Sequence, residues 1–212
     1  MTALALPDLF ILRHGETVWN VEGRMQGRFD SDLTLRGQVQ SVAMGAGLRQ
    51  AGVGPETHCW ISSPQGRAVA TARLARGDLG AVHLDERLAE IGMGDWAGLT
   101  RAEIDARWPG PPTEDMIAFY ARIPNGESFD DLETRLTAFL NSLTGPTVIV
   151  THGMTARFLR MIALGVSRSN LLALSGGQGV IHHLQDGQAR LIDTGTGADG
   201  LHPDRSTCIG AV

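Results

Sequence analysis

Short apolar runs alternate along the chain with longer stretches in which apolar residues recur at helical spacing. The apolar runs predict strands, in chain order at 9–12, 59–61, 82–84, 147–150, 180–184 and 189–192. The stretches between them predict helices over 35–50, 64–74, 101–107, 127–143 and, after Gly153, up to 164. Strands that alternate with helices predict an α/β fold, here a three-layer αβα sandwich around a mostly parallel sheet.

The length of 212 residues fits a single domain, which we expect to span residues 1–195. The stretch 108–127 is rich in proline, glycine and acidic residues, so we expect a lid or insert near it. The tail, 196–212, is rich in glycine and aspartate, and we expect it to be loose.

The basic side chains narrow the possible chemistry, because all 18 are arginine and the chain contains no lysine. A P-loop lysine, a Schiff-base lysine and a pyridoxal-phosphate lysine are therefore excluded. The formal net charge is −5 and no basic arm is present, which argues against nucleic acid as a partner.

Cysteine content and hydropathy bear on the compartment. The two cysteines, Cys59 and Cys208, form no CxxC pair, which argues against a zinc cluster or a disulfide framework. No apolar run reaches the roughly 18–20 residues of a membrane helix. The first residues lack the basic start of a signal peptide. We therefore expect a cytoplasmic protein with no membrane partner.

Two predicted strands end in the same pattern, His-Gly-x-Thr, at His14 and at His152. Glycine after the histidine permits a sharp turn and lets a ligand approach backbone N–H groups. Ligands of such sheets bind beyond the carboxyl ends of the strands. If the two strands are neighbours, the two imidazoles face each other. The alternative is that they are two unrelated histidines at strand ends.

Two arginines and a glutamate complete the candidate site. Arg13 directly precedes His14, and Arg67 lies on the first turn of the helix predicted after Ser62-Ser63-Pro64. Guanidinium groups bind phosphate oxygens bidentately and remain charged, so this set suits a dianion. Glu90, between apolar residues in a Gly-rich stretch, is a candidate proton donor for a leaving oxygen.

Six segments of the chain, in order, resemble the histidine phosphatase superfamily, which includes phosphoglycerate mutases and α-ribazole phosphatase. They are Leu12-Arg13-His14-Gly15-Glu16-Thr17 with Trp19-Asn20; Gln26-Gly27 with Asp30 and Leu33-Thr34-x-x-Gly37; Ser62-Ser63-Pro64 with Arg67 and Thr71-Ala72; Leu88 to Gly98; Asn125-Gly126-Glu127-Ser128; and Val150-Thr151-His152-Gly153. The resemblance spans nearly the whole chain and implies the phosphoglycerate mutase-like fold.

The resemblance also implies roles. His14 would be the nucleophile, Glu90 the acid and base, and Arg13, Arg67 and His152 would hold the transferring phosphoryl group. It further implies substrate contacts, which we expect from Asn20, Thr17, Gln26 and Gly27. Thr17 has a second interpretation, as the cap of the following helix. The scheme needs no metal or other cofactor, and its partner is a small phosphorylated metabolite.

The expected lid carries Trp108, Phe119, Tyr120 and Arg122, which are suited to hold a ring or a second anionic group. We expect Arg122 to be a substrate-binding residue. The alternative is a lid packed on its own apolar residues. Dimers are common among similar proteins, so a homodimer is compatible with the resemblance.

Two alternative functions remain open. The first is a mutase. The shortness of the chain and the segment Ile91-Gly92-Met93-Gly94-Asp95-Trp96 favour a phosphatase, whereas Ala97, where similar phosphatases often have glutamate, puts the substrate class in doubt. The second is a non-catalytic phosphate-binding protein, against which the presence of all five catalytic candidates argues.

Two further motifs do not indicate a site. Leu174-Ser175-Gly176-Gly177-Gln178 matches the signature of ABC-transporter ATPases, which also need a lysine that this chain lacks. We interpret it as a loop that leads to the strand at Val180. His182 and His183 are adjacent on a predicted strand and so point to opposite faces, one expected exposed and the other packed.

Overall fold

The computed structural model describes residues 6–77 and 80–196. Its strands are β1 (Leu9–Arg13), β2 (Cys59–Ser62), β3 (His83–Leu84), β4 (Thr147–Thr151), β5 (Val180–Gln185) and β6 (Gln188–Asp193). Its α-helices are α1 (Val18–Val21), α2 (Leu35–Gln50), α3 (Gly66–Arg76), α4 (Arg101–Arg107), α5 (Met116–Ala121), α6 (Phe129–Leu140) and α7 (Gly153–Leu164). Short 3₁₀ turns occupy η1 (Glu86–Leu88), η2 (Gly94–Trp96) and η3 (Arg168–Ala173).

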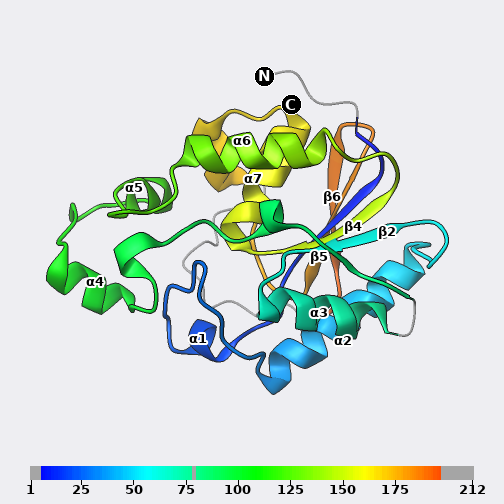
Figure 1. Cartoon of the computed structure of the whole chain (residues 1–212), viewed down its shortest axis with the longest axis horizontal. Coiled ribbons are helices and arrows are strands. Elements are labelled where there is room, and N and C mark those ends of the chain that lie inside the picture. The colour runs from blue at the N-terminus through cyan, green and yellow to red at the C-terminus, as the bar shows by residue number, and fades with distance from the viewer. Residues whose placement is uncertain (1–5, 78–79, 197–212) are drawn as a thin grey trace.

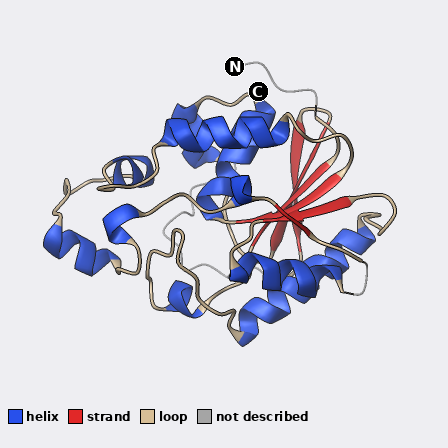
Figure 2. Cartoon of the chain, viewed as in Figure 1, coloured by secondary structure: helices blue, strands red, loops and turns tan. Residues whose placement is uncertain are grey.

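The described strands form one six-stranded sheet in the order β3-β2-β4-β1-β5-β6. Strands β1 to β4 pair in parallel, and β5 and β6 form an antiparallel hairpin beside β1 (Figure 2). Asp186 and Gly187, at the hairpin tip, both have positive φ, as a tight two-residue hairpin turn requires. The sheet is therefore mostly parallel, as the alternation of strands and helices predicted.

Alternate residues of β1 face opposite sides of the sheet and build two separate cores. Leu9 and Ile11 belong to the core under α6 and α7, and Phe10 and Leu12 to the core under α2 and α3. Figure 1 shows these two helix pairs on opposite sides of the strands. The three-layer αβα prediction is confirmed.

The helix predicted over 35–50 begins and ends at the predicted residues. It begins after Thr34 because the Thr34 side chain accepts a hydrogen bond from the N–H of Gly37. The helix predicted from residue 64 begins instead at Gly66 and runs on to Arg76. Within the described residues, no helix is long and apolar enough to cross a membrane.

The expected lid region contains a helix that the sequence pattern did not predict, α5, capped by Asp115. Helices α4 and α5 lie on the side of the molecule away from the sheet (Figure 1). Phe119 and Trp108 pack with Trp96, so these aromatic rings belong to the hydrophobic core. Movement of this region remains a prediction. The expected loose tail lies, from residue 197 onward, outside the described residues.

His182 and His183 do point to opposite faces, but both are buried, which corrects the expectation that one is exposed. His182 contacts Arg160 of α7 through its Nδ1 atom at 3.2 Å. His183 stacks on Phe10 and hydrogen-bonds Asp8 on the other side of the sheet. Helix α7 covers one face of β5, and α2 together with the segment around Asp8 covers the other, so neither histidine is exposed to solvent.

Candidate active site

The two His-Gly segments meet at one edge of the sheet because β1 and β4 are adjacent parallel strands, with Arg13 opposite Thr151. The backbone N–H of His14 donates to Thr151 O at 2.9 Å, which continues the ladder to the strand ends. The ring centroids of His14 and His152 lie 5.2 Å apart. The expected juxtaposition of the two histidines is therefore confirmed.

The hydrogen bonds of His14 define its reactive atom. Nδ1 lies 2.8 Å from Gly15 O, and a carbonyl only accepts, so Nδ1 carries the proton. Nε2 then has a lone pair, toward which Arg67 Nε donates at 3.3 Å. Burial, with the nearby charges of Arg67 and Arg13, holds the pKa of His14 well below its ordinary value. The site thus presents a neutral imidazole with a directed lone pair, as a nucleophile requires.

His152 is fully buried beside Ser63, whose Oγ lies 2.7 Å from His152 Nε2. Ser63 Oγ accepts from Gln65 N at 3.3 Å, so its own proton is free to be donated to Nε2. That arrangement favours the tautomer with a proton on Nδ1, a buried atom with no hydrogen-bond partner among the described residues. Burial, together with Arg67 and His14, holds the pKa of His152 well below its usual range.

The Arg67 guanidinium is held rigidly by the loop before α2. Its Nη2 donates to Gly27 O at 2.9 Å, and Nη1 donates to Phe29 O at 2.6 Å and to Asp30 Oδ1 at 3.0 Å. Gly27 has φ of +52°, and a Cβ there would lie 2.7 Å from the Met93 side chain, so only glycine turns this carbonyl toward Arg67. Gly27 therefore supports the site through its backbone.

Glu90 lies at the N-terminus of α7. Its Oε1 accepts from Ile91 N at 3.0 Å and from Thr155 N at 3.1 Å, and it lies 3.0 Å from Thr155 Oγ1, whose proton is shared with Ala89 O at 2.9 Å. Among the described residues, Oε2 accepts one bond, from Met154 N at 3.2 Å. These donors fix the carboxyl group and leave Oε2 as the oxygen with capacity to exchange a proton with a ligand. Gln65 Oε1 accepts from Glu90 N at 2.7 Å and links this loop to the Arg67 region.

Arg13 lies beside Glu90 on the same side of Gly153. A Cβ added to Gly153 would be 3.5 Å from Arg13 Cζ and 3.7 Å from Glu90 Oε2, so both groups lie around the start of α7. Burial lowers the pKa of Arg13, and the charge of Glu90 opposes that effect. Arg13 Nε is a buried donor with no hydrogen-bond partner in the described part of the chain.

Thr17 is bonded to Asn20 and to Gln26, and the expected substrate contacts of Thr17 and Gln26 stay predictions. Thr17 is buried and forms a capping box with Asn20 at the start of α1. Its hydroxyl also accepts from Gln26 Nε2 at 2.8 Å. These bonds occupy the Thr17 hydroxyl and support the interpretation of Thr17 as a cap. Gln26 Oε1 is buried and has no hydrogen-bond partner among the described residues.

Other groups of the protein engage Arg122 in the structure, and its expected role in substrate binding stays a prediction. The guanidinium pairs with Glu114, donates to Trp108 O at 2.9 Å and lies 4.7 Å over the Trp96 ring. It fastens α5 to α4 and to the core. Tyr120, in α5, lies close enough to Glu90 and Arg13 for the charges of both to affect its pKa. Burial raises the pKa of Tyr120 to about 12.

Three residues that the sequence reasoning did not select support the site: Ser63, Gln65 and Gln178. Ser63 and Gln65 lie at the carboxyl end of β2, so the rule about strand ends was a signal that pointed to them. Gln178 Nε2 donates to Asn20 Oδ1 at 2.9 Å and approaches His14 O at 3.4 Å. Gln178 belongs to the segment interpreted as a mere loop, and its position follows only from the tertiary fold.

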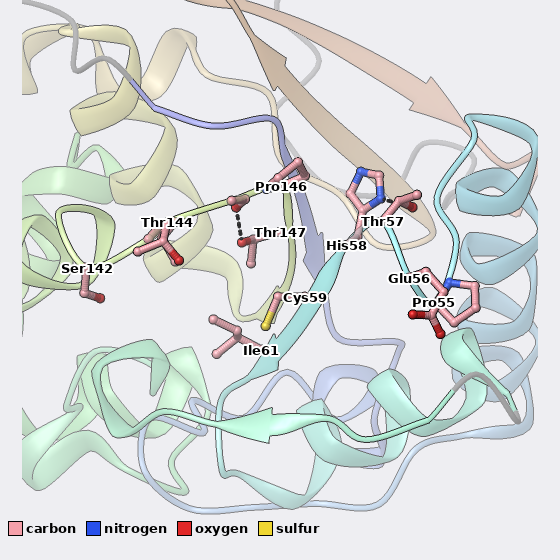
Figure 3. A pocket seen from close by; sticks show the side chains of 12 residues that line it. Pro55, Glu56, Thr57, His58, Cys59, Ile61, Ser142, Thr144, Pro146 and Thr147 are labelled. Carbon is pink, nitrogen blue, oxygen red and sulfur yellow. Dashed lines mark hydrogen bonds between the residues drawn. The ribbon is translucent and has the colours of Figure 1, made fainter.

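A hollow of about 430 Å³ lies at the opposite edge of the sheet, by the amino ends of β2 and β4 (Figure 3). Its lining includes Pro55, His58, Cys59, Pro146 and Thr147. Figure 3 shows two hydrogen bonds around it, one between Thr57 and His58 and one from the Thr147 hydroxyl to a backbone oxygen. No arrangement there resembles the convergent charges at the ends of β1 and β4, so we assign the chemistry to the histidine edge.

Comparison with known proteins places this site in a family. The family model of the histidine phosphatase superfamily (branch 1) matches residues 9–191. A 2,3-bisphosphoglycerate-dependent phosphoglycerate mutase of Sphingopyxis alaskensis is 31% identical, with 85% of this chain and 94% of the relative covered. A probable phosphoglycerate mutase of Citrobacter koseri is 34% identical, with 79% and 75% covered.

Solved structures show the same likeness. A mycobacterial glucosyl-3-phosphoglycerate phosphatase in complex with VO3 has a TM-score of 0.72 and 33% identity, covering 88% of this chain and 96% of that one. An α-ribazole phosphatase of Shigella flexneri has a TM-score of 0.71 and 26% identity, with 88% and 95% covered. The chain belongs to the histidine phosphatase superfamily, whose members here carry both phosphatase and mutase names.

Proposed function

We propose that the protein is a metal-independent phosphomonoesterase that hydrolyses a small phosphorylated metabolite of the cytoplasm through a phosphohistidine on His14. One observation carries the proposal. Two buried donors without partners among the described residues, Arg13 Nε and His152 Nδ1, accompany the lone pair of His14 Nε2. A buried donor left unpaired costs about 1–3 kcal/mol, which an oxyanion ligand would recover.

In the first step, the lone pair of His14 Nε2 forms a bond to phosphorus as the bond from phosphorus to the ester oxygen breaks. The leaving oxygen takes the proton of the Glu90 carboxyl. Arg13, Arg67 and His152 stabilise the charge on the equatorial oxygens, and in a loose transition state such fixed donors supply most of the catalysis. The Nδ1–H bond to Gly15 O holds the imidazole while it gains positive character.

In the second step, the Glu90 carboxylate takes a proton from water as the water oxygen attacks phosphorus. The bond from phosphorus to Nε2 breaks, which returns a neutral His14, a protonated Glu90 and inorganic phosphate. The positive charge that balances the phosphoryl group comes from Arg13 and Arg67, so the scheme needs no metal ion.

The test is phosphate release from p-nitrophenyl phosphate and a panel of sugar phosphates and phosphoglycerates, with EDTA present. We expect release by the wild type, trapping of an acid-labile phosphoenzyme, and loss of both in His14→Ala. His83→Ala is the matched control, because His83 is exposed on β3, away from the site. Release that survives His14→Ala would overturn the proposed nucleophile.

A second candidate, phosphoglycerate mutase activity, is supported by the names of the relatives at 31% and 34% identity. It shares the first step and differs in that a second substrate hydroxyl, not water, attacks the phosphohistidine. Conversion of 3-phosphoglycerate to 2-phosphoglycerate, run beside the panel, separates the two. Isomerisation without phosphate release would replace the phosphatase proposal.

A further inference from the structure

The Asn20 side chain is oriented by three donors that converge on its oxygen. Asn20 Oδ1 accepts from Thr17 N at 3.1 Å, from Thr17 Oγ1 at 3.0 Å and from Gln178 Nε2 at 2.9 Å. The reversed amide would place Nδ2 against the N–H of Thr17, which only donates. Nδ2 therefore faces away from these donors and makes no hydrogen bond within the described residues, so it is available to a ligand.

The orientation of Gln178 is determined in the same way. Its Nε2 atom also lies 3.4 Å from His14 O, and a carbonyl oxygen can only accept. The two hydrogens of this NH₂ group thus serve the nucleophile segment and Asn20 together. Gln178 connects the backbone of the proposed nucleophile with a proposed phosphate contact, although it lies 164 and 158 positions from them along the chain.

Helix α7 holds the loop that carries Gln178. Arg157 Nε donates to Leu174 O at 3.1 Å, and Arg160 Nη2 donates to Ser175 O at 2.7 Å. Arg160 is itself buried and is fixed by a bond to Ala156 O at 3.1 Å. Because α7 begins directly after His152, the same helix positions His152, Glu90 and the loop of Gln178.

We propose that Gln178 is a positioning residue that fixes the Asn20 amide with Nδ2 toward the phosphoryl group. This inference rests on the proposed function, which makes Asn20 a phosphate contact. The Gln178 side chain acts through Asn20 and touches no reacting atom. Its loss leaves Asn20 Oδ1 with the two Thr17 donors, which still exclude the reversed amide but let it rotate away from the orientation that donates to phosphate.

The test is a double-mutant cycle of Gln178→Met and Asn20→Ala. Methionine keeps the length of glutamine and lacks the donor, and Gln178→Ala serves as a second variant if Gln178→Met does not fold. Gln185→Met, at the exposed end of β5, is the matched control. The measurements are kcat and KM for p-nitrophenyl phosphate, and the binding of orthophosphate and vanadate by calorimetry, which requires no turnover.

We expect Asn20→Ala to weaken vanadate and orthophosphate binding about 10-fold or more, as for a hydrogen bond to a charged group. Gln178→Met should weaken it about 3- to 10-fold and raise KM more than it lowers kcat. In the Asn20→Ala background, Gln178→Met should have little further effect, limited to the loss of its 3.4 Å contact with His14 O, and Gln185→Met should match the wild type throughout.

Two results would overturn the inference in distinguishable ways. If the wild type releases phosphate and the effects of Gln178→Met and Asn20→Ala multiply, Gln178 does not act through Asn20, and the proposed function stands. If the wild type neither turns over phosphate esters nor binds vanadate, the proposed function fails and the inference fails with it.

Discussion

The segment that follows the proposed nucleophile packs directly on the backbone of α2, and this contact yields a quantitative prediction. A Cβ on Gly37 would lie 2.0 Å from Glu16 O, and a Cβ on Gly15 would lie 2.2 Å from Gly37 O. Real Cβ atoms essentially never come within 3.0 Å of other atoms. Gly37→Ala therefore forces the two backbones apart by about 1 Å, since no side chain can rotate to relieve the contact.

Helix α2 supplies two matched controls. A Cβ on Gly45 would meet Ala75 O of α3 at 2.0 Å, a clash of the same kind away from the site. A Cβ on Gly47 would meet Ile181 Cδ1 at 3.2 Å, the end of a flexible side chain. Each substitution to alanine gains up to about 1 kcal/mol of helix propensity, so the three variants differ mainly in what the new methyl group contacts.

Overpacking costs about 1–3 kcal/mol, so Gly37→Ala and Gly45→Ala should each lose up to about 2 kcal/mol of unfolding free energy after the propensity gain. Gly47→Ala should be neutral or up to about 1 kcal/mol more stable. Because a 1 Å displacement of a reacting group can cost about 100-fold, Gly37→Ala should lower kcat/KM by about 10- to 100-fold. Gly45→Ala should change kcat/KM far less.

Urea unfolding and the kinetics of p-nitrophenyl phosphate hydrolysis measure both quantities on the same preparations. The reasoning is refuted if Gly37→Ala equals Gly47→Ala in stability and activity. Equal activity losses in Gly37→Ala and Gly45→Ala would show that activity follows general stability and not the position of the His14 segment.

Three further predictions follow from particular contacts. Burial, followed by the charge of Arg160, lowers the pKa of His182 from 6.5 to about 3. Between these two pH values the unfolded chain binds a proton at His182 that the folded protein does not, so the contribution of His182 to stability is complete above pH 6.5 and is lost as the pH falls. Between pH 7 and pH 5, urea unfolding of the wild type should show that this group loses about 2 kcal/mol of unfolding free energy. The total loss should be smaller in His182→Gln, and equal losses in the two proteins would contradict the prediction. Arg122→Ala should lower the melting temperature by breaking its pair with Glu114, yet leave the ranking of phosphate esters in a substrate panel unchanged; a changed ranking would support its substrate role. Tyr120→Ala should alter that ranking by several-fold in kcat/KM, and a uniform decrease across the panel would argue against contact with the substrate.

The sequence was sufficient for the strands and for placing His14 and His152 at the same edge of the sheet, but it left open whether their strands are neighbours. An apolar run flanked by turn residues is a local signal, and parallel strands share their carboxyl edge, whereas the adjacency of β1 and β4 is known only from the strand order of the fold. The start of α2 was predictable because a cap such as Thr34 acts on residues three positions away. The roles of the site residues remain predictions until variants are assayed.

Other features depend on partners that are distant in sequence, and local reasoning gave no access to them. Arg122 is engaged by Glu114 and the Trp96 ring, which the fold brings from separate segments. His183 is buried because Asp8 and Phe10 cover it. Gln178 was not selected because the motif that contains it was interpreted as a loop, and its contact with Asn20 joins two residues that are far apart in the sequence. In each case the residue type left several roles open, and packing selected one.

Five groups of the site fall into two sets according to what orients them. The backbone orients His14 through Gly15 O, Arg67 through Gly27 O and Glu90 through the first N–H groups of α7. Side chains orient two further phosphate contacts, His152 through Ser63 and Asn20 through Gln178.

Backbone positions change only when the fold is displaced, whereas a hydroxyl or an amide can be exchanged by one substitution. Displacing the first set, as in Gly37→Ala, should therefore lower kcat, because the geometry of phosphoryl transfer changes. Removing a side-chain support, as in Ser63→Ala or Gln178→Met, should act mainly on phosphate affinity and leave the nucleophile in place. Kinetics of the two groups of variants on one substrate would show whether this division between chemistry and binding holds.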